Sequence, residues 1–247
     1  MNRDEKLDRF TALPPTIADL ESRRVVFPRE PSGGTWISAN DAGLCLALLN
    51  WHRIAREPQN GVISRGQVVR ELAGKSSANE IAHGIMKLPL RKLRPFRLIA
   101  IVPLEKLVTE WRWDLECLAA RNHNWQPQHW FSSGFDERHA ERLRANVCAS
   151  FVTGGGAVAG GGDPGGRRSA RTGVNAAGYS LSWLRQLHRS HAPKRGPFSI
   201  CMHRRDAATV SYTEVAVSEK RASMRYKPGP VCAATRTTMA TLPIRAL

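Results

Sequence analysis

Two β-strands around a tight turn are predicted by the stretch Gly33-Gly34-Thr35-Trp36-Ile37-Ser38-Ala39-Asn40-Asp41-Ala42-Gly43-Leu44-Cys45-Leu46-Ala47-Leu48-Leu49-Asn50. Residues 35–39 favour a strand, and residues 40–43 favour a turn that tolerates left-handed backbone. Residues 44–49 form an almost continuous apolar run, which is typical of a strand buried on both faces. We therefore expect this hairpin to lie at the centre of a sheet.

Three short motifs accompany the hairpin along the chain. They are Asn2-Arg3-Asp4-Glu5 and Leu13-Pro14-Pro15 before it, and Ser64-Arg65-Gly66 after it. In this order, together with Gly-Gly-Thr-Trp-Ile, they resemble the NRDE family, which is also called the transport and Golgi organisation protein 2-like family. The resemblance is clearest over residues 2–74 and returns at residues 130–137 and 196–230.

The resemblance implies a fold, because the NRDE family is similar in turn to the N-terminal-nucleophile hydrolases. It implies one α+β domain over residues 1–247, built as an αββα sandwich whose first strand is missing from the chain as written. Residues 153–179 are expected to be a disordered insertion, because eight of the fourteen residues 153–166 are glycine.

Periodicity and capping residues predict the other elements. Helices are expected over residues 65–73 after the N-cap candidate Ser64, between Ser77 and Pro89, and over residues 136–152 and 181–191. Further strands are expected over residues 25–27, 96–102, 108–114, 125–133, 199–203, 209–217 and 223–226, with a bulge near Thr213. Residues 11–17 are interpreted as a loop, and the tail from Ala233 has no clear pattern.

N-terminal-nucleophile chemistry uses one residue twice, because its side chain attacks the acyl carbon while its own α-amine acts as the base. The resemblance implies that this residue is a Cys on a strand just upstream of the Asn-Arg-Asp-Glu motif. Met1 precedes the motif here, and its thioether has no proton to give up. We expect either a true start further upstream, at a Cys, or a non-catalytic relative. We favour the first, because loss of the strand would leave a sheet edge unpaired inside the sandwich.

Three residues are candidates for supporting roles in catalysis. The resemblance implies that Arg3 and Asp4 lie beside the nucleophile, where Asp4 would hydrogen-bond the α-amine and Arg3 would orient a thiolate. From residue types alone, the same motif is interpreted as a solvated cluster of charges. Asn50 follows the predicted central strand and could donate to an oxyanion hole, although it suits a turn at a strand end equally well.

Metal-binding residue types occur at two places. His188 and His191 are spaced three residues apart on a predicted helix and could share a metal ion, but no Cys or carboxylate stands at a ligand-like offset. Cys201 and His203 alternate on a predicted strand and would face the same side, as a Cys/His pair or as plain core residues. We predict no metal site and no cofactor.

The net charge of +16 is concentrated in residues 151–247, which hold 15 Lys and Arg against 4 Asp and Glu. A basic surface attracts nucleic acid or anionic lipid. However, Arg outnumbers Lys 29 to 8, and Gly and Ala are abundant, which a GC-rich gene produces regardless of function. Basic and aromatic residues are not interleaved as in single-strand binders, so no specific nucleic acid is expected as a partner.

The chain shows no sign of membrane insertion or export. No apolar run approaches the ~20 residues that span a bilayer, and no secretory signal opens the sequence. The five cysteines lack CxxC spacing, which favours reduced thiols and a cytoplasmic location over a disulfide framework.

Three functions follow as expectations. The resemblance implies an amidohydrolase or acylase that attacks a small-molecule amide or acyl bond, inactive as written because its nucleophile is absent. A non-catalytic carrier of an apolar ligand, related to haem or lipid homeostasis, is the second. The third is a basic binder of nucleic acid or anionic surfaces, which rests on charge alone. The sequence leaves the substrate and the oligomeric state open.

Overall fold

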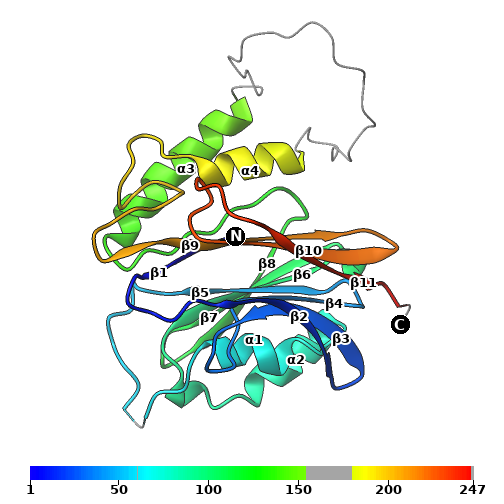
Figure 1. Cartoon of the computed structure of the whole chain (residues 1–247). Coiled ribbons are helices and arrows are strands. Elements are labelled where there is room, and N and C mark those ends of the chain that lie inside the picture. The colour runs from blue at the N-terminus through cyan, green and yellow to red at the C-terminus, as the bar shows by residue number, and fades with distance from the viewer. Residues whose placement is uncertain (60, 154–179, 246–247) are drawn as a thin grey trace, which may run out of the picture.

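The protein forms four layers in the order helices, sheet, sheet, helices (Figure 1). The computed structural model describes residues 1–59, 61–153 and 180–245. A four-stranded sheet packs against a seven-stranded sheet, with one pair of helices on each outer side. The expected αββα arrangement is therefore confirmed. The expected insertion at residues 153–179 lies outside the described residues except for Thr153, the last residue of a helix.

The seven-stranded sheet is antiparallel throughout, and the predicted hairpin forms its middle. The strand order is β2-β3-β4-β5-β6-β7-β8, so the second hairpin strand is the fourth of seven. The bounds are β2 Leu13–Leu20, β3 Arg23–Arg29, β4 Ile37–Asn40, β5 Cys45–Asn50, β6 Phe96–Val102, β7 Leu107–Trp113 and β8 Leu118–His123.

The four-stranded sheet joins the two ends of the chain, in the order β1-β9-β10-β11. Its strands are β1 Asn2–Lys6, β9 Ala207–Val217, β10 Arg221–Pro228 and β11 Thr238–Pro243. The Asn-Arg-Asp-Glu motif is thus itself an edge strand, paired antiparallel with β9. The pairing slips by one residue between Arg3 and Asp4, which leaves Val210 of β9 as the bulged residue, so the expected position of the bulge near Thr213 is wrong.

In the part of the chain that the structure describes, four α-helices cover the two sheets: α1 Gly66–Leu72, α2 Ala78–Met86, α3 Glu137–Thr153 and α4 Leu181–Arg189. Two short 3-10 helices, η1 Leu90–Lys92 and η2 Pro103–Glu105, flank β6. Ser77 and Ser180 cap α2 and α4 as expected, each accepting a hydrogen bond from the backbone N–H three residues later. At α1 the residue before the helix is Arg65, which already has helical backbone angles, and Oγ of Ser64 accepts a hydrogen bond from the Gly66 N–H at 3.3 Å.

Two apolar cores lie on the two faces of the hairpin. Leu44, Leu46 and Leu48 point toward α1 and α2, and Cys45 points toward the four-stranded sheet. The first core is completed by side chains such as Val69, Leu72, Ile81 and Ile85, and the second by Val26, Ala39, Met224, Tyr226 and Leu242. This two-sided burial explains why residues 44–49 are apolar without alternation.

Several predicted elements were wrong, for identifiable reasons. Residues 13–20 form β2 where a loop was expected, because an edge strand tolerates proline and the pairing skips Pro14 and Pro15. Residues 125–133 and 199–203 are not strands, although the first stretch is rich in aromatic residues and the second contains Ile200, Cys201 and Met202. Strands β8 and β11 were missed because they are mostly exposed and lack alternation.

The glycines of the Gly-Gly-Thr-Trp and Ser-Arg-Gly motifs pack directly against each other. A Cβ on Gly66 would lie 2.9 Å from the backbone nitrogen of Thr35 and 3.0 Å from the Cα of Gly34. The Gly66 carbonyl also accepts a hydrogen bond from the Thr35 N–H, at 3.2 Å. The start of α1 therefore lies on the entry to β4, at a distance that only glycine allows.

We predict that Gly66→Ala lowers the free energy of unfolding by about 2 kcal/mol, because backbone atoms would have to move to admit the methyl group. Helix propensity alone would favour alanine at this position, so a loss can be assigned to the clash. Urea denaturation measures the difference. Gly196→Ala is the matched control, since a Cβ there meets nothing within 4 Å. Equal stability of the two variants would contradict the close contact.

Candidate active site

A cavity of about 1600 Å³ lies at the motif strand β1. Its lining comes from β1, from the hairpin, from the loop of residues 125–134, from α3 and α4, and from the segment before β9. The aromatic loop expected as a strand thus forms one wall of the cavity. All three predicted catalytic residues, Arg3, Asp4 and Asn50, line this same cavity.

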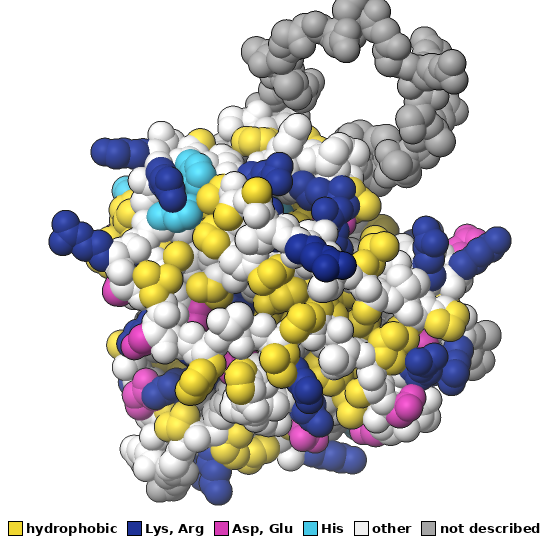
Figure 2. Space-filling model, in the orientation of Figure 1, with side chains coloured by type: hydrophobic (Ala, Val, Ile, Leu, Met, Phe, Trp, Pro, Cys, Tyr) yellow, Lys and Arg dark blue, Asp and Glu magenta, His cyan; other side chains and the backbone are white. Residues whose placement is uncertain are grey.

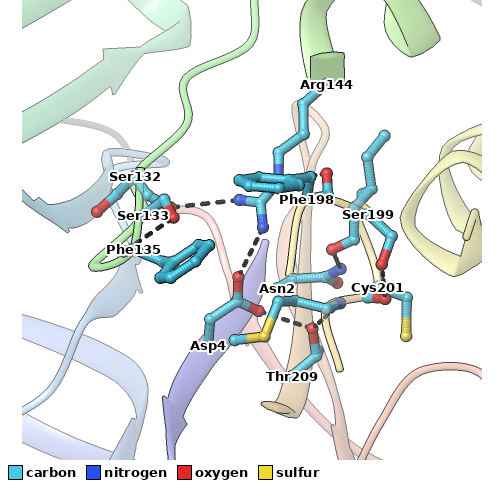
Figure 3. Close-up of polar contacts among 12 residues, drawn as sticks. Asn2, Asp4, Ser132, Ser133, Phe135, Arg144, Phe198, Ser199, Cys201 and Thr209 are labelled. Atoms are coloured by element: carbon cyan, nitrogen blue, oxygen red, sulfur yellow. Dashed lines mark hydrogen bonds and ion pairs between the residues drawn. The ribbon is translucent and has the colours of Figure 1, made fainter. Parts of the chain in front are cut away.

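Asp4 is held between α3 and β9 (Figure 3). Its Oδ2 accepts a hydrogen bond from Nη2 of Arg144 at 3.2 Å, and its Oδ1 accepts one from Oγ1 of Thr209 at 2.6 Å. Burial raises the pKa of the Asp4 carboxyl above its usual value, while Arg144 and Thr209 oppose that rise. Asp4 therefore contacts Arg144 and Thr209, while the contact with a nucleophile's α-amine that the resemblance implied stays a prediction.

Arg144 was missed in the sequence, and it connects three parts of the cavity wall. Its guanidinium donates to the carbonyls of Ser132 and Phe198 as well as to Asp4. The side chain is only 6% exposed. The sequence contained one signal for this role: Arg144 lies on the same stripe of α3 as the buried residues Ala140, Val147 and Cys148. An arginine at such a position needs a buried partner.

Arg3 reaches a different set of partners at the same cavity. Its Nη2 lies 2.5 Å from Oε1 of Glu30 and 3.4 Å from Oε2 of Glu5. The guanidinium also stacks over the Trp36 ring, with its Cζ 4.4 Å from the ring centroid. Arg3 is buried, so the motif is not the solvated charge cluster that residue types alone indicated. Catalytic roles for Arg3 and Asp4 stay predictions.

The first two residues of the chain are anchored beside the cavity. The α-amine of Met1 donates to the Thr213 carbonyl at 2.6 Å, and burial lowers its pKa to about 5. The Asn2 amide donates to the carbonyls of His188 and Ile200. A neutral amine could serve as a base, but the Met1 side chain offers no nucleophile to activate.

Asn50 lines the cavity, and its backbone carbonyl accepts a hydrogen bond from Oγ of Ser132 at 2.7 Å. Within the described residues, its side-chain amide has no hydrogen-bond partner. The amide is therefore available to a ligand, which is what the oxyanion-hole prediction needs. The oxyanion-hole role of Asn50 stays a prediction.

His188 and His191, which were considered as residues that could share a metal ion, do not converge. His188 lies half-buried at the cavity, and its ring centroid is 5.0 Å from that of Tyr212. His191 instead points to His203, and the two Nε2 atoms lie 3.2 Å apart. The other expected pair is present, because Sγ of Cys201 lies 3.6 Å from Nε2 of His203.

We predict that Arg144→Met lowers the free energy of unfolding by about 3 kcal/mol, because it leaves the Asp4 carboxylate without its cationic partner. Arg142→Met is the matched control on the same helix, at an exposed position, and should change stability by less than about 0.5 kcal/mol. The double variant Asp4→Asn/Arg144→Met should lose less free energy of unfolding than the two single variants lose together. Additive losses would contradict a coupled pair.

The stability deficit of Arg144→Met, meaning its loss of unfolding free energy relative to the unchanged protein, should also depend on pH. A carboxyl whose folded pKa is raised favours folding below its unfolded pKa, and this contribution is lost as pH rises through the folded pKa. Removal of Arg144 removes a group that lowers the pKa of Asp4, so the folded pKa rises further. The deficit, measured by urea denaturation, should shrink as pH falls from 7 towards about 4. A constant deficit would contradict the assignment to Asp4.

Comparisons with known proteins give a family and two solved structures of similar overall form. A comparison with curated proteins found no match. Penicillin V acylase from Agrobacterium tumefaciens is 12% identical with a TM-score of 0.49, over 96% of this chain and 80% of that one. A mutant of the conjugated bile acid hydrolase from Clostridium perfringens is 9% identical with a TM-score of 0.47, over 97% and 91%. The family described as Transport and Golgi organisation 2 matches residues 1–129, which is more than half of the sequence, and the chain therefore belongs to this family.

Proposed function

We propose that the cavity binds a small molecule with an apolar body and an acyl or amide group. The observation that carries the proposal is that apolar side chains and a charged pair line one and the same cavity. Apolar side chains such as Trp36, Ile99, Ile101, Leu184, Leu187 and Ile200 line it, and the Asp4–Arg144 pair lies at the same surface. Few convergent polar groups in an apolar hollow are typical of small-molecule sites.

In this proposal the apolar body of the ligand lies between the sheet and α4, and its carbonyl group lies near Asn50. The Asn50 amide can donate a hydrogen bond to a carbonyl oxygen, since no described residue occupies it. Arg144 already makes three hydrogen bonds to protein oxygens, so it shapes the wall and leaves recognition to neighbouring groups.

Binding without turnover is the function that the described cavity residues support best. Burial raises the pKa of the Cys148 thiol to about 11, so this cavity thiol stays protonated near neutral pH. The Ser132 hydroxyl donates to a carbonyl and not to a base.

No specific observation on the described residues supports a role as a binder of nucleic acid or anionic surfaces. Lys and Arg side chains are scattered over the visible face rather than gathered on one element (Figure 2). The expectation of no specific nucleic-acid partner stays a prediction. No helix within the described part of the chain has the length and apolar character needed to cross a bilayer.

Binding can be tested with a dansylated fatty acid, whose fluorescence rises on entering an apolar site. We predict saturable binding that Leu184→Trp weakens about tenfold or more, because the larger ring fills the cavity from the partly exposed face of α4. Gln186→Trp is the matched control, since Gln186 is exposed on the same helix and does not line the cavity. Equal affinities for both variants would contradict binding in this cavity.

Turnover is tested in parallel with a chromogenic fatty acyl anilide. The proposal predicts binding of the anilide with no release of the aniline above the buffer rate. Release that Leu184→Trp abolishes and Gln186→Trp preserves would contradict binding without turnover, and would support the amidohydrolase expectation instead.

A further inference from the structure

Two cysteines and two histidines meet outside the cavity. They are His191, Cys201, His203 and Cys232, and their ligand atoms all lie within 4.8 Å of one another. The residues come from three separate segments: the chain just after α4, the segment before β9, and the connection from β10 to β11. Cys201 is buried, both histidines are half-buried and Cys232 is exposed.

One ring nitrogen of His203 is the common neighbour of the other three groups. Its Nε2 lies 3.2 Å from Nε2 of His191, 3.6 Å from Sγ of Cys201 and 3.5 Å from Sγ of Cys232. A single imidazole nitrogen has one proton or one lone pair, so it cannot satisfy three hydrogen-bonding partners. Hydrogen bonding alone therefore does not account for this convergence.

A tetrahedral metal site does account for it. With Zn–N of about 2.05 Å and Zn–S of about 2.3 Å, the edges of a tetrahedron are roughly 3.3 Å between two nitrogens and roughly 3.6 Å between nitrogen and sulfur. The observed separations of 3.2, 3.5 and 3.6 Å match these edges.

We propose that His191, Cys201, His203 and Cys232 form a Cys₂His₂ site that binds Zn²⁺. Four protein ligands fill a tetrahedral zinc, so the site is structural and leaves no position for a substrate. Two thiolates also balance the charge of the ion, which suits a site in a chain as basic as this one.

The backbone around the ligands is already ordered by other contacts. The Cys201 N–H donates to the Ser190 carbonyl, and the His203 N–H donates to the Gly196 carbonyl. On the other side, Nζ of Lys227 donates to the carbonyls of Val231 and Ala233, which flank Cys232. Fixed neighbours of this kind reduce the entropy lost when the four side chains converge on an ion.

One contact has to change when the metal binds. Nη2 of Arg195 lies 3.4 Å from Nδ1 of His203, but a histidine bound through Nε2 carries its proton on Nδ1 and cannot accept there. Arg195 is exposed, so its side chain can turn into solvent at little cost.

The site would fasten the segment before β9, which supports the wall of the cavity. The Met202 N–H donates to Oγ1 of Thr209, and the same hydroxyl donates to Asp4. Metal binding at Cys201 and His203 therefore stabilises the residues on both sides of Met202. Loss of the ion is expected to loosen the support of Asp4 without removing a residue of the cavity.

Cobalt titration of the full chain under reducing conditions tests the proposal, because tetrahedral Co²⁺ bound by thiolates gives visible bands and a charge-transfer band in the near ultraviolet. We expect one Co²⁺ per chain, displaced by Zn²⁺. Cys232→Ser should weaken binding by more than the roughly 10–100-fold that outer-shell partners cost. Cys232 is exposed, so this variant is expected to fold. Cys117→Ser is the matched control, since Cys117 is also exposed and lies outside the cluster.

A second variant separates the ligand set from a simple thiol pair. His191→Ala should lose the tetrahedral cobalt spectrum, whereas His83→Ala, at an exposed position on α2, should keep it. The absence of a thiolate-to-cobalt band in the unchanged protein, or equal affinity in Cys232→Ser and Cys117→Ser, would overturn the proposal. A Cys201–Cys232 disulfide that persists under these conditions, seen by mass spectrometry, would overturn it as well.

Discussion

The half-buried carboxylate of Asp4 is the constraint on which the arrangement around the cavity depends. It lies on β1, yet its partners come from α3 and β9, so one side chain joins the motif strand, an outer helix and the neighbouring strand. A carboxylate buried in this way has to be met by a cation or by hydroxyl donors, because its desolvation is costly. Arg144 meets that need and, through its other hydrogen bonds, positions the loops at Ser132 and Phe198.

The conspicuous motifs of the family have different physical purposes. The glycines of Gly-Gly-Thr-Trp and Ser-Arg-Gly serve packing, because the backbone of Gly66 lies against Gly34 and Thr35. The Asn-Arg-Asp-Glu strand serves the cavity, because its successive side chains reach helix α4, the Trp36 ring and Arg144. Scaffold and site thus occupy neighbouring stretches of the same short region of sequence.

The cavity and the proposed zinc site are joined by a short chain of contacts. Thr209 accepts from the backbone of Met202 and donates to Asp4, so the segment that carries two proposed metal ligands also supports the acidic wall. In this arrangement the metal would act on ligand binding only through position, since the four ligands are separate from the cavity lining. Such coupling between the two sites requires no additional contacts, because it uses hydrogen bonds that the fold already makes.

The sequence indicated the layered fold through its resemblance to a known family. Its own patterns determined the central hairpin and most helices, because apolar runs and capping residues are local signals that act before tertiary contacts form. It also singled out Arg3, Asp4 and Asn50, which the fold brings to one cavity, but it could not identify their partners. Arg144 lies 140 residues from Asp4, and Cys232 lies 29 from His203. Only the tertiary structure decided those pairings, because contacts between residues far apart in the sequence leave no periodic pattern along the chain. It also decided the exposed edge strands, because an edge position does not require alternating apolar residues.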